Sequence, residues 1–134
     1  MDIAEAVAFT REHHRAVLVT ARADGRPQLS PVVCAADADG HVLVSTRGRS
    51  AKARNASRDP AVSMCVMSDA FFGAWVQIDG RADVVAMPDA MEGLEDLYRR
   101  IQGEHPDWEE FRAEMVRQER VLLRIAVERA GPDR

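Results

Sequence analysis

In the segment VLVSTRGRSAKARNASRDPAVSM, residues 42–64, the pattern of apolar residues changes twice. The valine-rich runs at both ends are typical of strands, and the polar stretch between them is typical of a short helix. Ser50 is a good helix N-cap, Ala51 favours helix, and Asp59 followed by Pro60 ends it. The segment therefore predicts a strand, a helix from Ser50 to about Arg58, and a second strand.

Further strands are predicted on both sides of this unit. Together with the two above, the runs rich in valine and other β-branched residues are 16–22, 28–36, 41–46, 61–67, 74–80, 81–87 and 120–128. Asp-Gly turns at 23–27 and 37–40 have hairpin length, so the first three strands are expected to form an antiparallel meander. Six or seven short strands joined by hairpins favour a closed or partly closed antiparallel barrel, because a small open sheet would expose its edges.

Helical periodicity is present in three other places. Residues 3–14 predict an opening helix with Ile3, Ala6, Val7 and Thr10 on one stripe. Pro88 opens a second helix that Gly103 ends, with Met91, Leu94, Leu97 and Ile101 at three- and four-residue spacing. A third begins at Pro106 and Asp107, and the candidates for its inner face are Trp108, Phe111, Met115 and Val116. The predicted fold class is mainly β with short helices.

Length and composition set limits on the function. A chain of 134 residues can bury one substantial core, so residues 1–134 are expected to form a single domain. No run is long and apolar enough to insert into a membrane, and a net charge of -4 argues against a nucleic-acid partner. The first residues lack the order of a secretory signal, which favours the cytoplasm. Cys34 and Cys65 have no CxxC spacing and are expected to be buried, reduced thiols.

Positive charge is concentrated around the predicted central helix. Residues 45–60 hold Arg47, Arg49, Lys52, Arg54 and Arg58 against one acid, Asp59. The start of a helix presents free backbone N–H groups, and here three of these cations lie beside it. Amides, helix dipole and cations together are a common way to hold a phosphate. A solvated basic face is the alternative interpretation of such a charge run.

Several segments in order resemble a known superfamily. They are ADGRPQLSPVV, VLVSTRGRSAKARNASRDPAVSM, IDGRADVV and LYRRIQGEHPDWEEFRAEMVRQERVLLRI, and the similarity extends over nearly the whole chain, from about residue 14 to residue 127. The most specific pieces are DGRP, the S-x-K-x-x-N-x-x-x-D-P pattern at 50–60, and GEHPDW at 103–108. This succession is similar to the split β-barrel flavin and deazaflavin oxidoreductases, which resemble pyridoxamine 5′-phosphate oxidase, and within them to the short actinobacterial branch that uses coenzyme F-420.

The resemblance implies a homodimer with two cofactor sites at the subunit interface and a small-molecule substrate. It implies that Lys52 contacts the cofactor phosphodiester and that Ser45, Thr46, Ser50 and the amides near Ala51 line the same end of the site. The ring of the cofactor would then lie beside the second strand, at Gln28, Ser30, Pro31 and Val32. Arg47, Arg49 and Arg54 would reach the acidic oligoglutamate tail of F-420, and Trp75 lies on the strand that supplies an aromatic residue from the partner.

The chemistry implied is hydride transfer from the reduced deazaflavin to an enone, quinone or tetrapyrrole-like acceptor, with no catalytic side chain required. The four histidines have no metal-ligand spacing, and no metal site is predicted. The chain lacks the C-terminal extension with which pyridoxamine 5′-phosphate oxidases hold their substrate, so that activity is not expected. Two alternatives stay open: an FMN-binding oxidase or reductase of the same fold, and a non-catalytic protein that binds or carries F-420.

Overall fold

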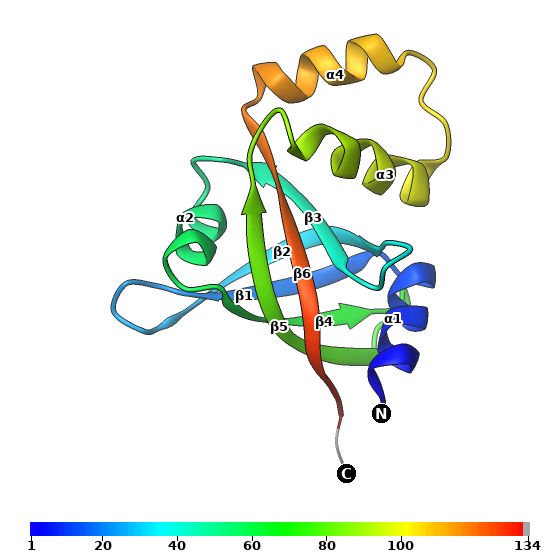
Figure 1. Ribbon diagram of the computed structural model, residues 1–134. Coiled ribbons are helices and arrows are strands. Elements are labelled where there is room, and N and C mark those ends of the chain that lie inside the picture. Colours follow the sequence, from blue (N-terminus) through cyan, green and yellow to red (C-terminus); the bar gives the residue numbers. More distant parts are fainter. Residues whose placement is uncertain (133–134) are drawn as a thin grey trace.

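The computed structural model describes residues 1–132 as a six-stranded barrel with four short helices around it (Figure 1). The strands are β1 (Arg15–Ala21), β2 (Pro27–Ala36), β3 (Val42–Arg47), β4 (Ala61–Met67), β5 (Trp75–Val85) and β6 (Arg120–Gly131). The helices are α1 (Ile3–Glu12), α2 (Ala51–Arg58), α3 (Ala90–Gln102) and α4 (Trp108–Arg117). The predicted fold class, mainly β with an antiparallel barrel, is confirmed.

The barrel closes in the strand order β1-β2-β3-β6-β5-β4, and every neighbouring pair is antiparallel. The expected meander of the first three strands is present. Gly25 and Gly40, in its two turns, have φ angles of 87° and 85°, in the left-handed region that glycine enters without steric cost. The barrel closes through the pairing of β1 with β4, so every strand has a neighbour on both sides over at least part of its length.

One prediction about the strands was wrong. The runs 74–80 and 81–87 form a single strand, β5, which bends around the barrel instead of turning back. The pairing with β6 shifts register between Asp79 and Gly80, as in a β-bulge. A Cβ on Gly80 would lie 2.3 Å from the carbonyl oxygen of Ala126, so this glycine permits the close approach of two backbones. Glycine here marks a bulge within a strand and not a hairpin.

The barrel is split between β2 and β3. These strands pair only from Cys34 to Ala36 on β2, opposite Val42 to Val44 on β3. Residues 27–33 of β2 pair with β1 on one side and have no strand partner on the other, while residues 45–47 of β3 pair with β6. The two strands therefore diverge, and they leave a gap in the sheet wall beside helix α2.

Two apolar clusters hold the elements together. The larger fills the barrel and includes Leu18, Met64 and Ile78, and the smaller joins α3 and α4 to the sheet through Leu94 and Leu122. Helix α3 begins at Ala90, two residues after Pro88, and ends at Gly103 as predicted. Val116, a candidate for the inner face of α4, is instead 58% exposed, because the short α4 contacts the rest of the fold through Phe111 and Met115.

The two cysteines differ in burial. Cys34 is buried and Cys65 is half-buried, and both are free thiols, so the expectation of burial is met in full only by Cys34. Among residues 1–132, no helix combines the length and the apolar character needed to cross a lipid bilayer.

Candidate functional site

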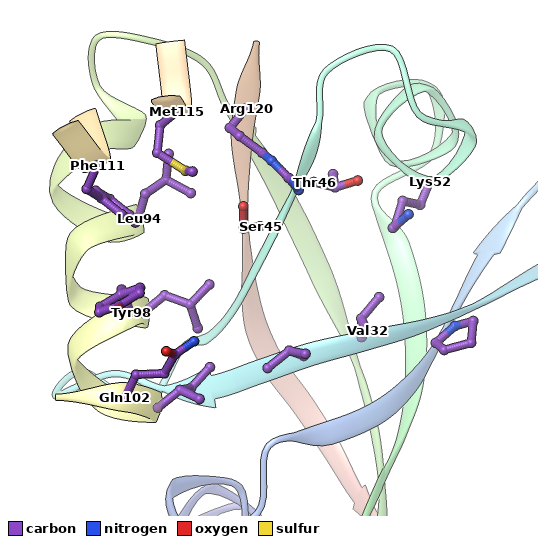
Figure 2. A pocket seen from close by; sticks show the side chains of 14 residues that line it. Val32, Ser45, Thr46, Lys52, Leu94, Tyr98, Gln102, Phe111, Met115 and Arg120 are labelled. Carbon is purple, nitrogen blue, oxygen red and sulfur yellow. The ribbon is translucent and has the colours of Figure 1, made fainter. Parts of the chain in front are cut away.

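A cavity of about 450 Å³ opens where β2 and β3 diverge (Figure 2). Its floor comes from the two strands, one wall from α2, and the opposite wall from α3 and α4. The volume is within the range of small-molecule sites, which hold roughly 300–1,000 Å³. The lining residues are Pro31, Val32, Val33, Ser45, Thr46, Lys52, Leu94, Leu97, Tyr98, Ile101, Gln102, Phe111, Met115 and Arg120.

The wall formed by α3 and α4 is apolar. Leu94, Leu97 and Ile101 lie on the inner stripe of α3, at the spacing that the sequence predicts, and Phe111 and Met115 come from α4. Tyr98 packs edge-on against Phe111, with ring centroids 5.3 Å apart, and this contact joins the two helices. This side of the cavity can accept a large apolar or aromatic group.

The opposite wall carries the start of α2. Ser50 is the N-cap: its Oγ accepts a hydrogen bond from the Ala53 N–H at 3.2 Å and another from the Thr46 hydroxyl at 3.0 Å. Lys52, in the first turn of the helix, is half-buried and lines the cavity. It is the only lysine in the chain. The start of α2, the side chains of Ser45 and Thr46 and this lysine therefore lie at one end of the cavity.

A buried polar network fixes α2 to the barrel. The Asn55 side-chain amide donates to the Thr20 hydroxyl at 3.1 Å, and its Oδ1 accepts from Arg58 at 2.8 Å. Thr20 in turn donates to Gln28 Oε1, and the amide of Gln28 donates to Ser30 Oγ at 2.9 Å. Asn55 belongs to the S-x-K-x-x-N pattern, so this residue of the motif holds the helix in place and does not line the cavity.

The residues expected at the site divide into two groups. Five of them line the cavity: Pro31, Val32, Ser45, Thr46 and Lys52. The remaining eight are outside the lining: Gln28, Ser30, Arg47, Arg49, Ser50, Ala51, Arg54 and Trp75.

The cations of the second group have different surroundings. Arg49 forms an exposed ion pair with Glu119, 2.9 Å between Nη2 and Oε2. Arg54 donates to the main-chain carbonyl of Arg49. Arg47 is exposed at the end of β3, next to the loop that leads into α2. Only Arg47 of these three has no hydrogen bond or ion pair from its side chain within residues 1–132, so it is the one most available to a ligand.

Trp75 lies at the start of β5, on the outer face of the barrel. Its cross-strand partner is Met67, which is followed across the sheet by Arg15 and then by Val33. Direct partners share a face, so this row runs from Trp75 to a residue that lines the cavity. A second row joins Pro31, Val17 and Cys65, and Leu29 is exposed on the same face. The outer surface of β2, β1 and β4 is thus largely apolar.

Sequence reasoning missed Arg120, which lines the cavity at the first position of β6. Burial and the nearby Arg47 guanidinium lower the pKa of its guanidinium from the ordinary value. Nothing in the sequence around Arg120 links it to the basic segment, because Arg120 begins an apolar strand 62 positions after that segment ends at Arg58. Only the pairing of β3 with β6 brings it to Arg47.

A separate polar cluster lies at the turn between β2 and β3. The ligand atoms of Asp37, Asp39 and His41 come within 4.8 Å of one another. One Oδ of Asp37 already accepts hydrogen bonds from the Asp39 and His41 backbone N–H groups, both at 2.9 Å. The cluster is therefore explained by the turn, where an aspartate commonly bonds the backbone that follows it.

Comparison with known proteins agrees with this architecture. The family model described as pyridoxamine 5′-phosphate oxidase matches residues 3–132. An "F420H(2)-dependent biliverdin reductase" of Mycobacterium tuberculosis is 32% identical over 126 residues, which cover 93% of this chain and 83% of that protein.

Solved structures give the same result for the fold. The conserved hypothetical protein Rv2991 of Mycobacterium tuberculosis superposes with a TM-score of 0.76 at 27% identity, covering 97% of this chain and 82% of that one. A protein described as "F420 Reductase" superposes with a TM-score of 0.72 at 22% identity, covering 92% and 94%. The 32% identical reductase agrees with the expectation of an oxidoreductase. The chain belongs to the pyridoxamine 5′-phosphate oxidase family of split β-barrels.

Proposed function

We propose that the protein is a reductase that binds coenzyme F-420 in the cavity between α2 and α3 and transfers a hydride to an unsaturated small molecule. One observation carries the proposal: a single cavity has the only lysine of the chain, at a capped helix start, on one wall and an apolar helix pair on the other. A phosphorylated, flat, largely apolar cofactor needs both. The 32% identical relative is named for F420H(2), which favours the deazaflavin over FMN.

The residues present fit the phosphate end of such a cofactor. Lys52 and Arg120 both line the cavity, and neither has a carboxylate within ion-pair distance in residues 1–132. Two half-buried cations without acidic partners form a site for an anion. The hydroxyl of Ser45 and the first N–H groups of α2 add uncharged donors at the same end, while the Thr46 hydroxyl already donates to Ser50 Oγ.

When bound, the reduced deazaflavin supplies the hydride, and the protein supplies position and electrostatics. Pro31, Val32 and Val33 form a floor of small side chains against which a flat ring can lie. Leu94, Leu97 and Met115 form the apolar opposite wall of the cavity. The described lining has no carboxylate and no histidine, so we infer that water supplies the proton that completes the reduction.

The proposed active form is a homodimer that uses the apolar outer face of β2, β1 and β4. Leu29, Val33 and Trp75 are large apolar residues exposed on this face, at 58%, 54% and 46%. Trp75 and Val33 lie at opposite ends of this face. A twofold axis through the middle of the face would place the partner subunit's Trp75 next to Val33. Because Val33 lines the cavity, the partner subunit's Trp75 would then approach the cavity. This arrangement keeps the expectation that Trp75 acts across the interface. A cytoplasmic location and the absence of a nucleic-acid partner likewise remain predictions.

The test is a titration of the purified protein with F-420 and FMN side by side, followed by turnover. We expect saturable binding of F-420 at one site per chain, with weaker binding of FMN. Reduced F-420 should then be oxidised, without oxygen, by at least one acceptor from a panel of enones, quinones and linear tetrapyrroles. A yellow protein that retains FMN would support the FMN alternative, and tight F-420 binding without turnover would support a carrier. Binding of neither cofactor would refute the proposal.

A further inference from the structure

We propose that Arg120, from the first position of β6, binds the same phosphate group as Lys52 and forms the second half of a two-cation site. This inference rests on the proposed function, because it names a second contact within that cavity. It differs from the sequence expectation, in which only the basic segment around α2 supplied cations. The ligand chemistry is a phosphate ester of a planar cofactor.

The position of Arg120 supports the assignment. Arg120 is the direct cross-strand partner of Arg47, the last residue of β3. The next residue of that loop, Gly48, donates its N–H to the carbonyl of Glu119 at 2.9 Å. The corner before β6 therefore lies against the loop that leads into the Ser50 cap of α2. Figure 2 shows the Arg120 side chain extending from β6 toward Thr46, on the side of the cavity where Lys52 projects from α2.

The Arg120 side chain is held in orientation but is not neutralised. Its Nε donates to Gln118 Oε1 at 2.8 Å, and the Gln118 amide donates to Glu114 Oε1 at 2.6 Å. This chain of bonds fixes the guanidinium from α4 and leaves its two Nη groups without a hydrogen bond to residues 1–132. Arg49, three residues beyond Thr46 in the same loop region, is instead paired with Glu119.

Without a bound anion, the positive charges of Arg120 and Arg47 repel each other. Burial and repulsion from Arg47 both act against the charged form of Arg120, which is why its pKa is lowered. Arg47 and Arg120 are direct cross-strand partners, and like charges opposite each other repel. A bound phosphate removes this repulsion and accepts two parallel N–H bonds from the free Nη groups, a geometry that guanidinium provides and ammonium does not.

The experiment compares ligands with and without phosphate. Dissociation constants for F-420 and for its phosphate-free deazaflavin riboside are measured with wild type, Arg120→Gln and Arg120→Lys. We expect Arg120→Gln to weaken F-420 binding roughly tenfold or more and to leave binding of the riboside unchanged. Arg120→Lys keeps the charge but loses the fork and the Gln118 bond, so it should recover only part of the affinity. If Arg120→Gln folds poorly, the intermediate affinity of Arg120→Lys still tests the inference.

The matched control is Arg11→Gln, which removes one positive charge from α1, on the other side of the barrel from α2 (Figure 1). It should leave both dissociation constants unchanged. Equal weakening of F-420 and riboside by Arg120→Gln, or no effect on either, would overturn the inference. A raised KM for an acidic acceptor with unchanged F-420 binding would also overturn it, because Arg120 would then contact the acceptor. If wild type binds neither ligand, the proposed function itself fails, so the two failures are distinguishable.

Discussion

Arg47 and Arg120 are direct cross-strand partners at the end of the ladder between β3 and β6. Like charges directly opposite each other destabilise a sheet, and burial adds to the cost for Arg120. The pair lies near the N-terminus of α2, where the N-cap Ser50 and Lys52 are also found. This end of the cavity therefore concentrates positive charge in a protein with a net charge of -4, which is the basis of the proposal that it binds an anion.

Replacing Asn55 with alanine should destabilise the fold without touching the cavity lining. The variant loses the bonds to Thr20 and Arg58 and leaves the buried Thr20 hydroxyl with one partner fewer. The free energy of unfolding should fall by about 1–3 kcal/mol, the usual cost of breaking buried polar pairs. Urea unfolding measures it. Ser57→Ala, in the same helix but at an exposed position, is the control and should change stability by less than about 0.5 kcal/mol. Equal stability of the two variants would show that the network contributes little.

The stability of the protein should depend on Cys34 at alkaline pH. Burial raises the pKa of this thiol from 9.0 to about 12, so above pH 9 the unfolded chain loses the proton while the folded chain keeps it. The contribution is fully present below pH 9 and is lost as the pH rises toward 12, at about 1.4 kcal/mol per pH unit. The measurement is urea unfolding of wild type and Cys34→Ala from pH 8 to 11. The difference between them should shrink as pH rises, and parallel curves would contradict the prediction.

A charge placed on the apolar outer face should break the proposed dimer. Leu29→Glu introduces a carboxylate at a position that is 58% exposed in a single chain, so the fold itself should tolerate it. Analytical ultracentrifugation should find a dimer for wild type and a monomer for the variant, and F-420 binding should weaken with dissociation. Val116→Glu, equally exposed on α4, is the control and should stay dimeric. A monomeric wild type, or a dimeric Leu29→Glu, would argue against this interface.

The single lysine offers a chemical test of the cavity. Pyridoxal 5′-phosphate condenses with primary amines, and borohydride makes the product permanent. Lys52 and the N-terminal amine are the only primary amines in the chain, so peptide mass spectrometry separates them. We expect labelling of Lys52 that F-420 prevents, and weaker labelling by pyridoxal, which lacks phosphate. Labelling of Lys52 that F-420 does not reduce would place the ligand elsewhere.

Much of the fold could be predicted from local patterns. The helix after Ser50, the hairpins at Gly25 and Gly40, and the end of α3 at Gly103 all depend on chemistry within a few residues. The continuous strand through Gly80 could not be predicted, because its glycine serves a contact with Ala126, 46 positions later. From local sequence alone, a glycine between two apolar runs predicts a turn, and only the partner strand shows that it is a bulge.

The site could be predicted in part for the same reason. Lys52 and Ser50 belong to one short segment, so their neighbourhood follows from helix geometry. Arg120 reaches the cavity only through the register of β6 against β3, which sequence spacing does not reveal. The ion pair of Arg49 with Glu119 likewise depends on a long-range contact. It leaves Arg49 less available to an acidic tail than its position in the basic run indicates.

The central claim, that the start of α2 binds the phosphate of a flat redox cofactor, is tested most directly by titrating F-420 into wild type and Lys52→Ala. The lysine is half-buried and has no partner among residues 1–132, so thermal unfolding of the variant should match wild type. Loss of one charge-assisted contact, about 1.5–3 kcal/mol, should raise the dissociation constant roughly tenfold to a hundredfold. An unchanged dissociation constant in a folded Lys52→Ala protein would contradict the claim.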